Sequence, residues 1–156
     1  MMEVSVMHEG VDDDEPPSCD WIEKVVQQTL RTARIEAPCE VSVLLTNDQK
    51  MRELNREYRG KDKPTDVLSF AFEEGDIVAL PPGAPRLLGD VILSLPTIRQ
   101  QAANHGQTYA RECAWALCHG TLHLLGFDHQ TDLEEEKMRG VETDVLTGLG
   151  EEMLGW

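Results

Sequence analysis

The chain has 156 residues, of which 40% are hydrophobic, and a formal net charge of −15. This length is ordinary for one domain with a core of its own, and no apolar run approaches the roughly 18–20 residues of a membrane span. The four cysteines form no Cys-x2-Cys pair, so a zinc ribbon is not expected. With no signal-peptide pattern at the amino terminus, we expect reduced thiols and a cytoplasmic protein.

Apolar periodicity predicts a single domain, 1–156, of the α/β (α+β) class. Alternating or continuous apolar runs predict four short strands, at 4–7, 41–45, 67–72 and 89–94. The run at 41–45 is nearly all apolar, as in a strand covered on both faces. Between the elements we expect a polar acidic loop at 8–19 and a mobile loop, rich in proline and glycine, at 73–86.

Capping residues and apolar stripes predict about five helices around these strands. Asp20 is expected to cap the first helix, and Thr131 or Asp132 the last. The expected helices run from 20 to about 33, from 46–48 to 58–60, from 96 to about 105, from 108 to 125, and from 131–132 to about 146. The order of the elements indicates a small mixed sheet of four strands packed with helices.

The most informative segment is His119-Gly-Thr-Leu-His123-Leu-Leu-Gly126-Phe-Asp128-His129. In a helix, His119 and His123 project from the same face, because they are four residues apart. Gly126 then ends the helix, since glycine enters the left-handed cap conformation without strain, and the chain can turn back to bring His129 to the other two. Three convergent imidazoles are the ligand set of a catalytic zinc with an open fourth position. The bland alternative is three histidines bonded to backbone carbonyls.

The spacing His-x3-His-x2-Gly-x2-His matches the zinc run of metzincin peptidases. Those enzymes carry a glutamate directly after the first histidine, as general base for the water that attacks the peptide. This chain has Gly120 at that position. The metal ligands are therefore expected without the peptidase base, which argues against peptide hydrolysis by the usual route and leaves other metal-activated chemistry open.

The variant as it stands, HGTLHLLGFDH, resembles the YbeY family of bacterial endoribonucleases. Two further segments resemble the family in order and spacing, so that the resemblance covers roughly residues 40 to 147. They are Asn55-x-x-Tyr58-Arg59 followed by PTDVLSF at 64–70, and LGDVILS at 88–94. The chain departs from the family at Phe127, where tyrosine is frequent, and in its acidic amino-terminal segment.

The resemblance implies a zinc-dependent, single-strand-specific endoribonuclease that acts on ribosomal RNA, at the 3′ end of the small-subunit RNA, and in ribosome quality control. It implies one zinc ion per chain, held by His119, His123 and His129, with Arg59 at the active site. It also places the metal-binding helix centrally against the sheet, with one strand lining the cleft. Single-stranded RNA and the ribosome or its proteins are the implied partners; neither a membrane nor DNA is expected.

The net charge conflicts with an RNA substrate, because phosphate binding normally needs a basic surface. Residues 50–63 reverse the balance and hold six of the fourteen basic residues. The helical part of this segment is as well explained by ion pairs along a solvated helix. For Arg59, Lys61 and Lys63, at the end of that helix and in the loop after it, we favour contact with phosphate.

Two acids have open roles. Glu112 either orients a ligand histidine or lies at the solvated start of its helix, and Asp128 either accepts a proton from a histidine or caps the turn. Two other functions also remain: a non-catalytic ribosome assembly factor with a structural metal, or a metallopeptidase with an unusual base. A structural zinc needs a fourth protein ligand, and Cys118 points about 100° away from His119 around the helix.

Overall fold

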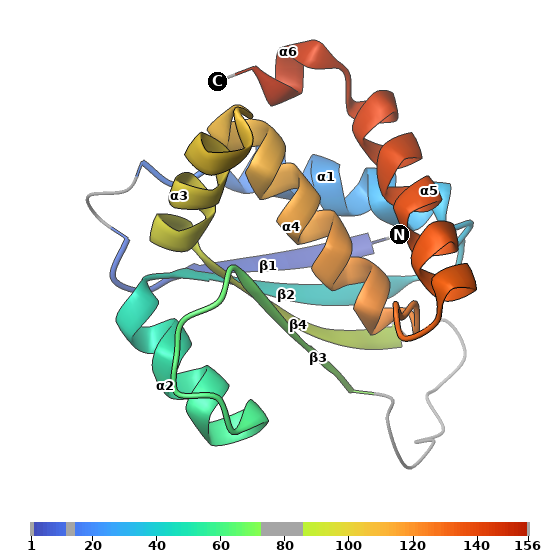
Figure 1. Ribbon diagram of the computed structural model, residues 1–156. Helices are drawn as coiled ribbons and strands as arrows, with labels where there is room; N and C mark the ends of the chain where they lie inside the picture. The colour runs from blue at the N-terminus through green and yellow to red at the C-terminus, as the bar shows by residue number, and fades with distance from the viewer. Residues whose placement is uncertain (1, 12–14, 73–85, 156) are drawn as a thin grey trace.

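The fold is described from a computed structural model that covers residues 2–11, 15–72 and 86–155. It consists of a four-stranded sheet and helices on both of its faces (Figure 1). The elements in chain order are β1 (Met2–His8), α1 (Cys19–Thr32), β2 (Cys39–Thr46), α2 (Asp48–Arg59), β3 (Val67–Ala71), β4 (Arg86–Ser94), α3 (Leu95–His105), α4 (Tyr109–Leu124), α5 (Asp132–Leu149) and α6 (Glu151–Leu154).

The sheet has the strand order β1-β2-β4-β3 and is mixed. β2 pairs in parallel with β1 and β4, whereas β3 pairs antiparallel with β4 and forms an edge. The register between β2 and β4 shifts beside Val41, where β4 contains an extra residue before Gly89. Gly89 has a φ of +145°, and a side chain there would meet the carbonyl oxygen of Phe70 at 2.1 Å, so this bulge requires glycine.

The two faces of the sheet are covered unequally. α1 and α4 pack on one face, where Val41, Val43 and Leu45 of β2 are buried in the main core. α2 covers the other face through Met51, which packs against Leu68 and Ile92. Ser42 of β2 is exposed, so the expectation of a strand covered on both faces holds only toward its carboxyl end. The reason is that α2 follows β2 directly and reaches only that end of the sheet (Figure 1).

The predicted histidine helix is the central helix of the fold. α4 lies against β3 and β4 and also contacts α1, α3, α5 and α6 (Figure 1). At Gly120 the helix approaches the sheet so closely that a Cβ atom would lie 2.7 Å from Val91 and 3.0 Å from Val67. Gly120 therefore sets how near the histidine-bearing face of α4 lies to β3.

The predicted fold class, mixed sheet and central helix are confirmed, with differences at several boundaries. Ser18, not Asp20, caps α1, because its side chain accepts the Trp21 N–H at 3.1 Å while Asp20 already lies in the first turn. Thr131 is the cap of α5, which extends beyond the predicted end to Leu149. A sixth helix, α6, was not predicted, since four residues carry too little periodicity to be recognised.

The two predicted loops are shorter than 8–19 and 73–86. His8 is the last residue of β1, Cys19 is the first of α1, and Arg86 begins β4. Val11 is buried in the core, so the first connection is not solvated throughout. Residues 12–14 and 73–85, on which the acidic and mobile characters were predicted, lie outside the described residues. Within the described ranges, every helix is too short or too polar to cross a bilayer.

Replacing Gly120 by alanine should destabilise the fold by about 1–3 kcal/mol, because a methyl group overpacks the contact with Val91 and Val67. Gly140→Ala is a matched control on the exposed side of α5, where an added Cβ meets no atom within 4 Å. It should stabilise the fold by about 0.5–1 kcal/mol, the gain in helix propensity. Urea unfolding of both variants in a chelator measures the difference, and equal stabilities would contradict the close contact.

Candidate metal centre

His119 and His123 lie one turn apart on α4, and their rings face the same point. Their Nε2 atoms are 3.2 Å apart, and the rings are nearly perpendicular. Nitrogen ligands of one tetrahedral zinc ion are separated by about 3.3 Å, given Zn–N distances of about 2.0–2.1 Å. The helical pair is therefore already spaced for a shared metal ion.

His129 joins this pair because the chain reverses directly after α4. The N–H of Phe127 donates to the carbonyl of Leu122, and the N–H of Gly126 donates to that of His123. This pattern is a Schellman motif, and it requires the positive φ of +93° that Gly126 adopts. The turn brings the ring centroid of His129 to 5.3 Å from that of His123. One nitrogen from each of the three histidines lies within 4.8 Å of the others, so the three can hold one metal ion.

Two neighbouring side chains contact the ring of His119 and can fix its orientation. The indole of Trp115 stacks on it at 4.8 Å between centroids and an interplanar angle of 24°. On the other side, Oε1 of Glu142 in α5 is 3.5 Å from Nδ1 of His119. Since the Nε2 atom faces His123, the carboxylate addresses the nitrogen that points away from the metal position, as in the carboxylate–histidine pairs of metal centres.

The sequence alone did not identify Glu142. The signal was an acid on the apolar stripe of α5, four residues after Met138 and three before Val145, both of which are buried. Glu142 is itself 6% exposed, and its Oε2 atom is buried without a hydrogen-bond partner among the described residues. A buried carboxylate with an unpaired oxygen costs stability, so its presence is better explained by the histidine it faces.

Of the two acids considered from the sequence, neither bonds to an imidazole ring of the three histidines within the described residues. Glu112 is buried at the start of α4 and pairs with Nδ1 of His105 at 3.3 Å, so it is neither solvated nor directed at the three histidines. Asp128 accepts the N–H of His129 at 2.7 Å, which stabilises the turn that carries this histidine. The buried Cys118 points into the cluster around Met138, and burial raises the pKa of its thiol to about 12.

The electrostatic environment favours a neutral His123. Burial lowers the pKa of His123, and the neighbouring His119 and His129 lower it further; Asp128 opposes them as a smaller effect. A metal ion binds the neutral imidazole and competes with protons for it. The site is therefore prepared for a cation at neutral pH.

Arg59 lies in the same hollow as the histidines. This hollow, of about 350 Å³, is lined by Arg59, the strand β3, Trp115 and the face of α4 that carries His119 and His123. The guanidinium donates to the Ser69 carbonyl at 2.8 Å and lies 4.8 Å from the centre of the Phe70 ring. These contacts bring the end of α2 around the edge strand to the metal position, although the residues are sixty positions apart in the sequence.

The rest of the basic segment is distributed differently. Arg52 forms a two-pronged ion pair with Asp62, at 2.8 and 3.0 Å, and Arg56 lies 3.9 Å from the same acid. These pairs replace the predicted ion pairs along the helix and lower the pKa of Asp62. Lys61 and Lys63 are exposed, and within the described residues they form no ion pair.

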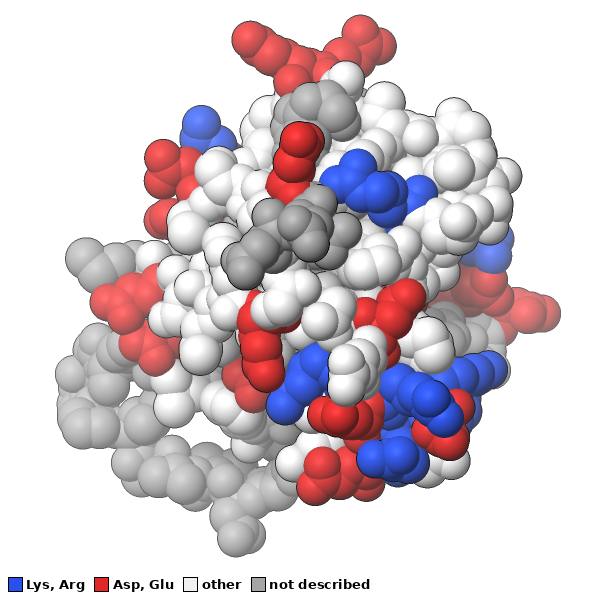
Figure 2. All heavy atoms as spheres, turned by 90° about the vertical axis from the view of Figure 1, so that its left-hand side faces the viewer, with Lys and Arg blue, Asp and Glu red and all other residues white. Residues whose placement is uncertain are grey.

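Basic and acidic side chains alternate over α2 and the segment that follows it. In Figure 2 blue side chains gather at the lower right over this part of the molecule, with red ones among them. Asn55 fixes the segment after α2 with two hydrogen bonds. Its side-chain amide donates to the Lys63 carbonyl at 2.8 Å, and its backbone carbonyl accepts the Lys61 N–H at 3.2 Å. Arg59 reaches the metal hollow directly, whereas the two lysines lie on the surface outside it.

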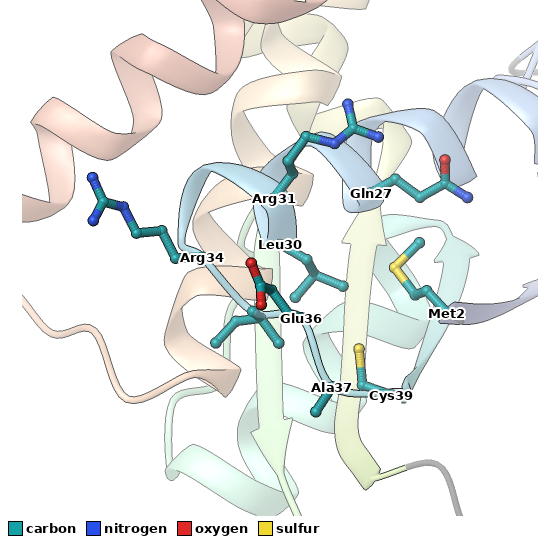
Figure 3. A pocket seen from close by; sticks show the side chains of 9 residues that line it. Met2, Gln27, Leu30, Arg31, Arg34, Glu36, Ala37 and Cys39 are labelled. Atoms are coloured by element: carbon teal, nitrogen blue, oxygen red, sulfur yellow. The ribbon is translucent and has the colours of Figure 1, made fainter. Parts of the chain in front are cut away.

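A larger hollow, of about 540 Å³, lies at the carboxyl end of α1 beside β1. Its two arginines, Arg31 and Arg34, point away from each other rather than to a common centre (Figure 3). Arg31 instead donates to Gln28 at 3.2 Å. Size alone therefore does not identify the site; convergence of the functional groups does.

The sequence is similar to those of known proteins. The family model described as "Endoribonuclease YbeY" matches residues 7–150. Relatives named Endoribonuclease YbeY include one from Roseiflexus castenholzii, 45% identical over 83% of this chain and 82% of its own length. One from Bacillus cereus is 42% identical over 83% and 85%, and one from Bacillus mycoides is 37% identical over 94% and 98%.

The fold has a counterpart among solved structures. The solution structure of TM1509 from Thermotoga maritima superposes with a TM-score of 0.58, covering 94% of this chain and 91% of that protein. The sequence identity is 23%, so this likeness bears on the fold alone.

Glu142→Gln should weaken zinc binding about tenfold, because it removes the carboxylate that orients His119 and makes its imidazole a more basic ligand. Glu112→Gln is the matched control, since it removes an equally buried acid that faces His105 instead. Competition titration with a chromophoric chelator measures both affinities. If the two substitutions weaken zinc binding equally, Glu142 has no special relation to the metal.

Zinc affinity should change little between pH 8 and 7 and fall from about pH 6 downward, because the ordinary histidine pKa is near 6.5 and that of His123 is lower. The stability of the folded chain should depend on pH in the same direction as the zinc affinity. A lowered folded-state pKa gives stability that is present above the unfolded pKa and is lost as the pH falls through the folded one. Zinc titrations from pH 5 to 8 test this, and an affinity that rises on acidification would contradict neutral imidazole ligands.

Proposed function

Because the chain belongs to the YbeY endoribonuclease family, we propose that it is a zinc-dependent endoribonuclease specific for single-stranded RNA. One observation carries the proposal: of three convergent histidines, His119 and His123 line one hollow together with an arginine from a distant helix. His119, His123 and His129 are the proposed ligands of one zinc ion. Arg59 is the proposed catalytic arginine.

Bound at these histidines, zinc would supply a Lewis acid that activates an attacking oxygen and polarises the phosphoryl group. The residues of the chain do the rest. Arg59 is permanently charged, and its contacts with Ser69 and Phe70 hold the guanidinium at the hollow, where it can stabilise charge that develops on the phosphate. Glu142 and Trp115 keep the ring of His119 in position for the metal.

The arrangement disfavours the peptidase alternative. A glutamate at position 120 would have to enter the contact with Val91 and Val67, where even a Cβ atom does not fit. Glu142 faces the outer nitrogen of His119, and Glu112 pairs with His105, so neither of these buried acids is placed as the base of a metallopeptidase. An RNA substrate carries its own possible nucleophile, the 2′-hydroxyl. If this hydroxyl attacks the phosphate, the product is a cyclic phosphate. If water attacks, the product is a terminal monophosphate.

The proposed substrate is ribosomal RNA, cut in the maturation of the small-subunit 3′ end and in ribosome quality control. A chain with a net charge of −15 should bind bulk RNA weakly, and Lys61 and Lys63 are the proposed further phosphate contacts. Selectivity would then come from the ribosome or a ribosomal protein. This role places the protein in the cytoplasm, with neither membrane nor DNA as a partner.

Purified protein should cut a labelled single-stranded RNA, and His123→Ala, prepared identically, should bind no zinc and cut at least about a hundredfold more slowly, as expected on loss of metal activation. Zinc content by elemental analysis and gel analysis of the products measure both effects. His8→Ala is the control, because it removes an exposed histidine at the end of β1, outside the cluster. Equal cutting by all three proteins would indicate a contaminating nuclease and remove the support for the proposal.

Arg59→Glu should retain the fold and the zinc but reduce RNA cleavage by about a hundredfold or more, because it replaces the charge that faces the phosphate. Arg56→Glu makes the same change of net charge on the same helix, at a residue that pairs with Asp62. It should have a much smaller effect on the cleavage rate. If the two variants lose activity equally, the general charge of the segment matters and Arg59 has no place in the reaction.

A further inference from the structure

A second hollow adjoins the metal hollow, and the two form one groove; the second is lined from α3, α4 and α5 and by Asp66, the residue before β3. It has a volume of about 450 Å³ and shares two lining residues, Asp66 and Trp115, with the hollow that holds Arg59, His119 and His123. Its volume lies in the range of small-ligand sites. A polymeric substrate bound at the metal position could therefore extend into the neighbouring hollow.

The two hollows follow each other in a fixed direction. Along α4, Trp115 precedes His119 and His123; along β3 and the loop before it, Asp66 precedes Val67 and Ser69. Gly120 lies against Val67, which aligns the two elements, and Arg59 is bonded at the level of Ser69. The groove thus passes from Arg59 across the histidines to Trp115 and then into the second hollow.

The lining of the second hollow differs from that of a phosphate site. It contains two amide side chains, Gln101 from α3 and Gln107 from the turn before α4. Among its lining residues Arg111 is the one with a permanent positive charge, and it is opposed by the acids Asp66 and Glu112. An excess of acids disfavours a polyanion, whereas amides and carboxylates are the groups that pair with the donors and acceptors of nucleobase edges.

Trp115 provides the wall between the hollows. One side of its indole stacks on His119 at 4.8 Å, and the residue is only partly buried and lines both spaces. Base–aromatic stacking is a general means by which proteins hold single-stranded nucleic acid, because every base has a π face. A base in the second hollow would therefore have an indole and polar side chains in its surroundings.

We propose that this second hollow is a nucleobase subsite, which receives the base of a nucleotide next to the phosphodiester at the metal centre. Gln101 and Gln107 contact the base edge, and Trp115 separates the base from the metal ligands. The inference rests on the proposed function, since it names a part of the substrate for the same groove. It adds that the protein contacts a nucleobase, and such a contact contributes to RNA binding without a positive charge.

The test is equilibrium binding of a single-stranded oligoribonucleotide with 2′-O-methyl riboses and phosphorothioate linkages, which resists cleavage by either nucleophile. Fluorescence anisotropy compares the zinc-loaded wild type with the double variant Gln101→Ala/Gln107→Ala. The control is Gln100→Ala, which removes an exposed amide from the same helix that bonds to Asn104 at 3.1 Å. Gln101 is partly buried and Gln107 is exposed, so the double variant should fold as the wild type does.

The double variant should bind about tenfold more weakly, as expected for two lost hydrogen bonds, and the control should bind as the wild type does. A second probe of the same length but without bases separates the base from the backbone. Wild type should bind this abasic probe more weakly, and the double variant should bind it as well as the wild type does. Only the first probe should therefore distinguish the two proteins.

Three outcomes would overturn the subsite. They are equal binding of the first probe by all proteins, equal loss on both probes in the double variant, and equal affinity of the wild type for the two probes. Each would mean that the hollow holds no base. Failure of the proposed function is seen separately, as absence of cleavage of ordinary single-stranded RNA by a wild type that still distinguishes the two probes.

Discussion

The close contact between α4 and the sheet is the constraint on which the site depends. Gly120 has no side chain, so the helix lies against Val67 and Val91 at a distance that any larger residue would increase. This distance places His119 and His123 beside β3, and Arg59 reaches the same hollow from the other side of that strand. A wider spacing would separate the arginine from the histidines, although each would keep its own local structure.

The same contact relates the ligand spacing to the chemistry that the centre supports. The three histidines follow the metzincin spacing, but the position of the peptidase base is occupied by the packing of helix on sheet. The acid near the metal position comes instead from α5 and faces the outer nitrogen of His119. This histidine spacing thus occurs in a member of a family named for RNA cleavage, with Arg59 in the same hollow as His119 and His123.

The sequence was sufficient for several features with local determinants, although it missed Ser18 as the cap of α1. The spacing of the three histidines, the turn at Gly126 and the cap at Thr131 depend on neighbours within a few residues, and the structure has each of these local features. Contacts between distant elements were not predictable. Glu142 and Asp62 acquire their roles only when α5 meets α4 and the loop folds back on α2. Even the alternative roles for Glu112 omitted the correct partner, His105, since no periodicity relates α3 to α4.

The position of Glu142 has a consequence for biosynthesis. A chain leaves the ribosome amino terminus first, so α4 with its histidine pair is made before α5 with the acid that orients His119. Until α5 docks, nothing among the described residues replaces this carboxylate at the outer nitrogen of His119. A chain that ends before α5 would keep the three histidines and lack the carboxylate that faces Nδ1 of His119.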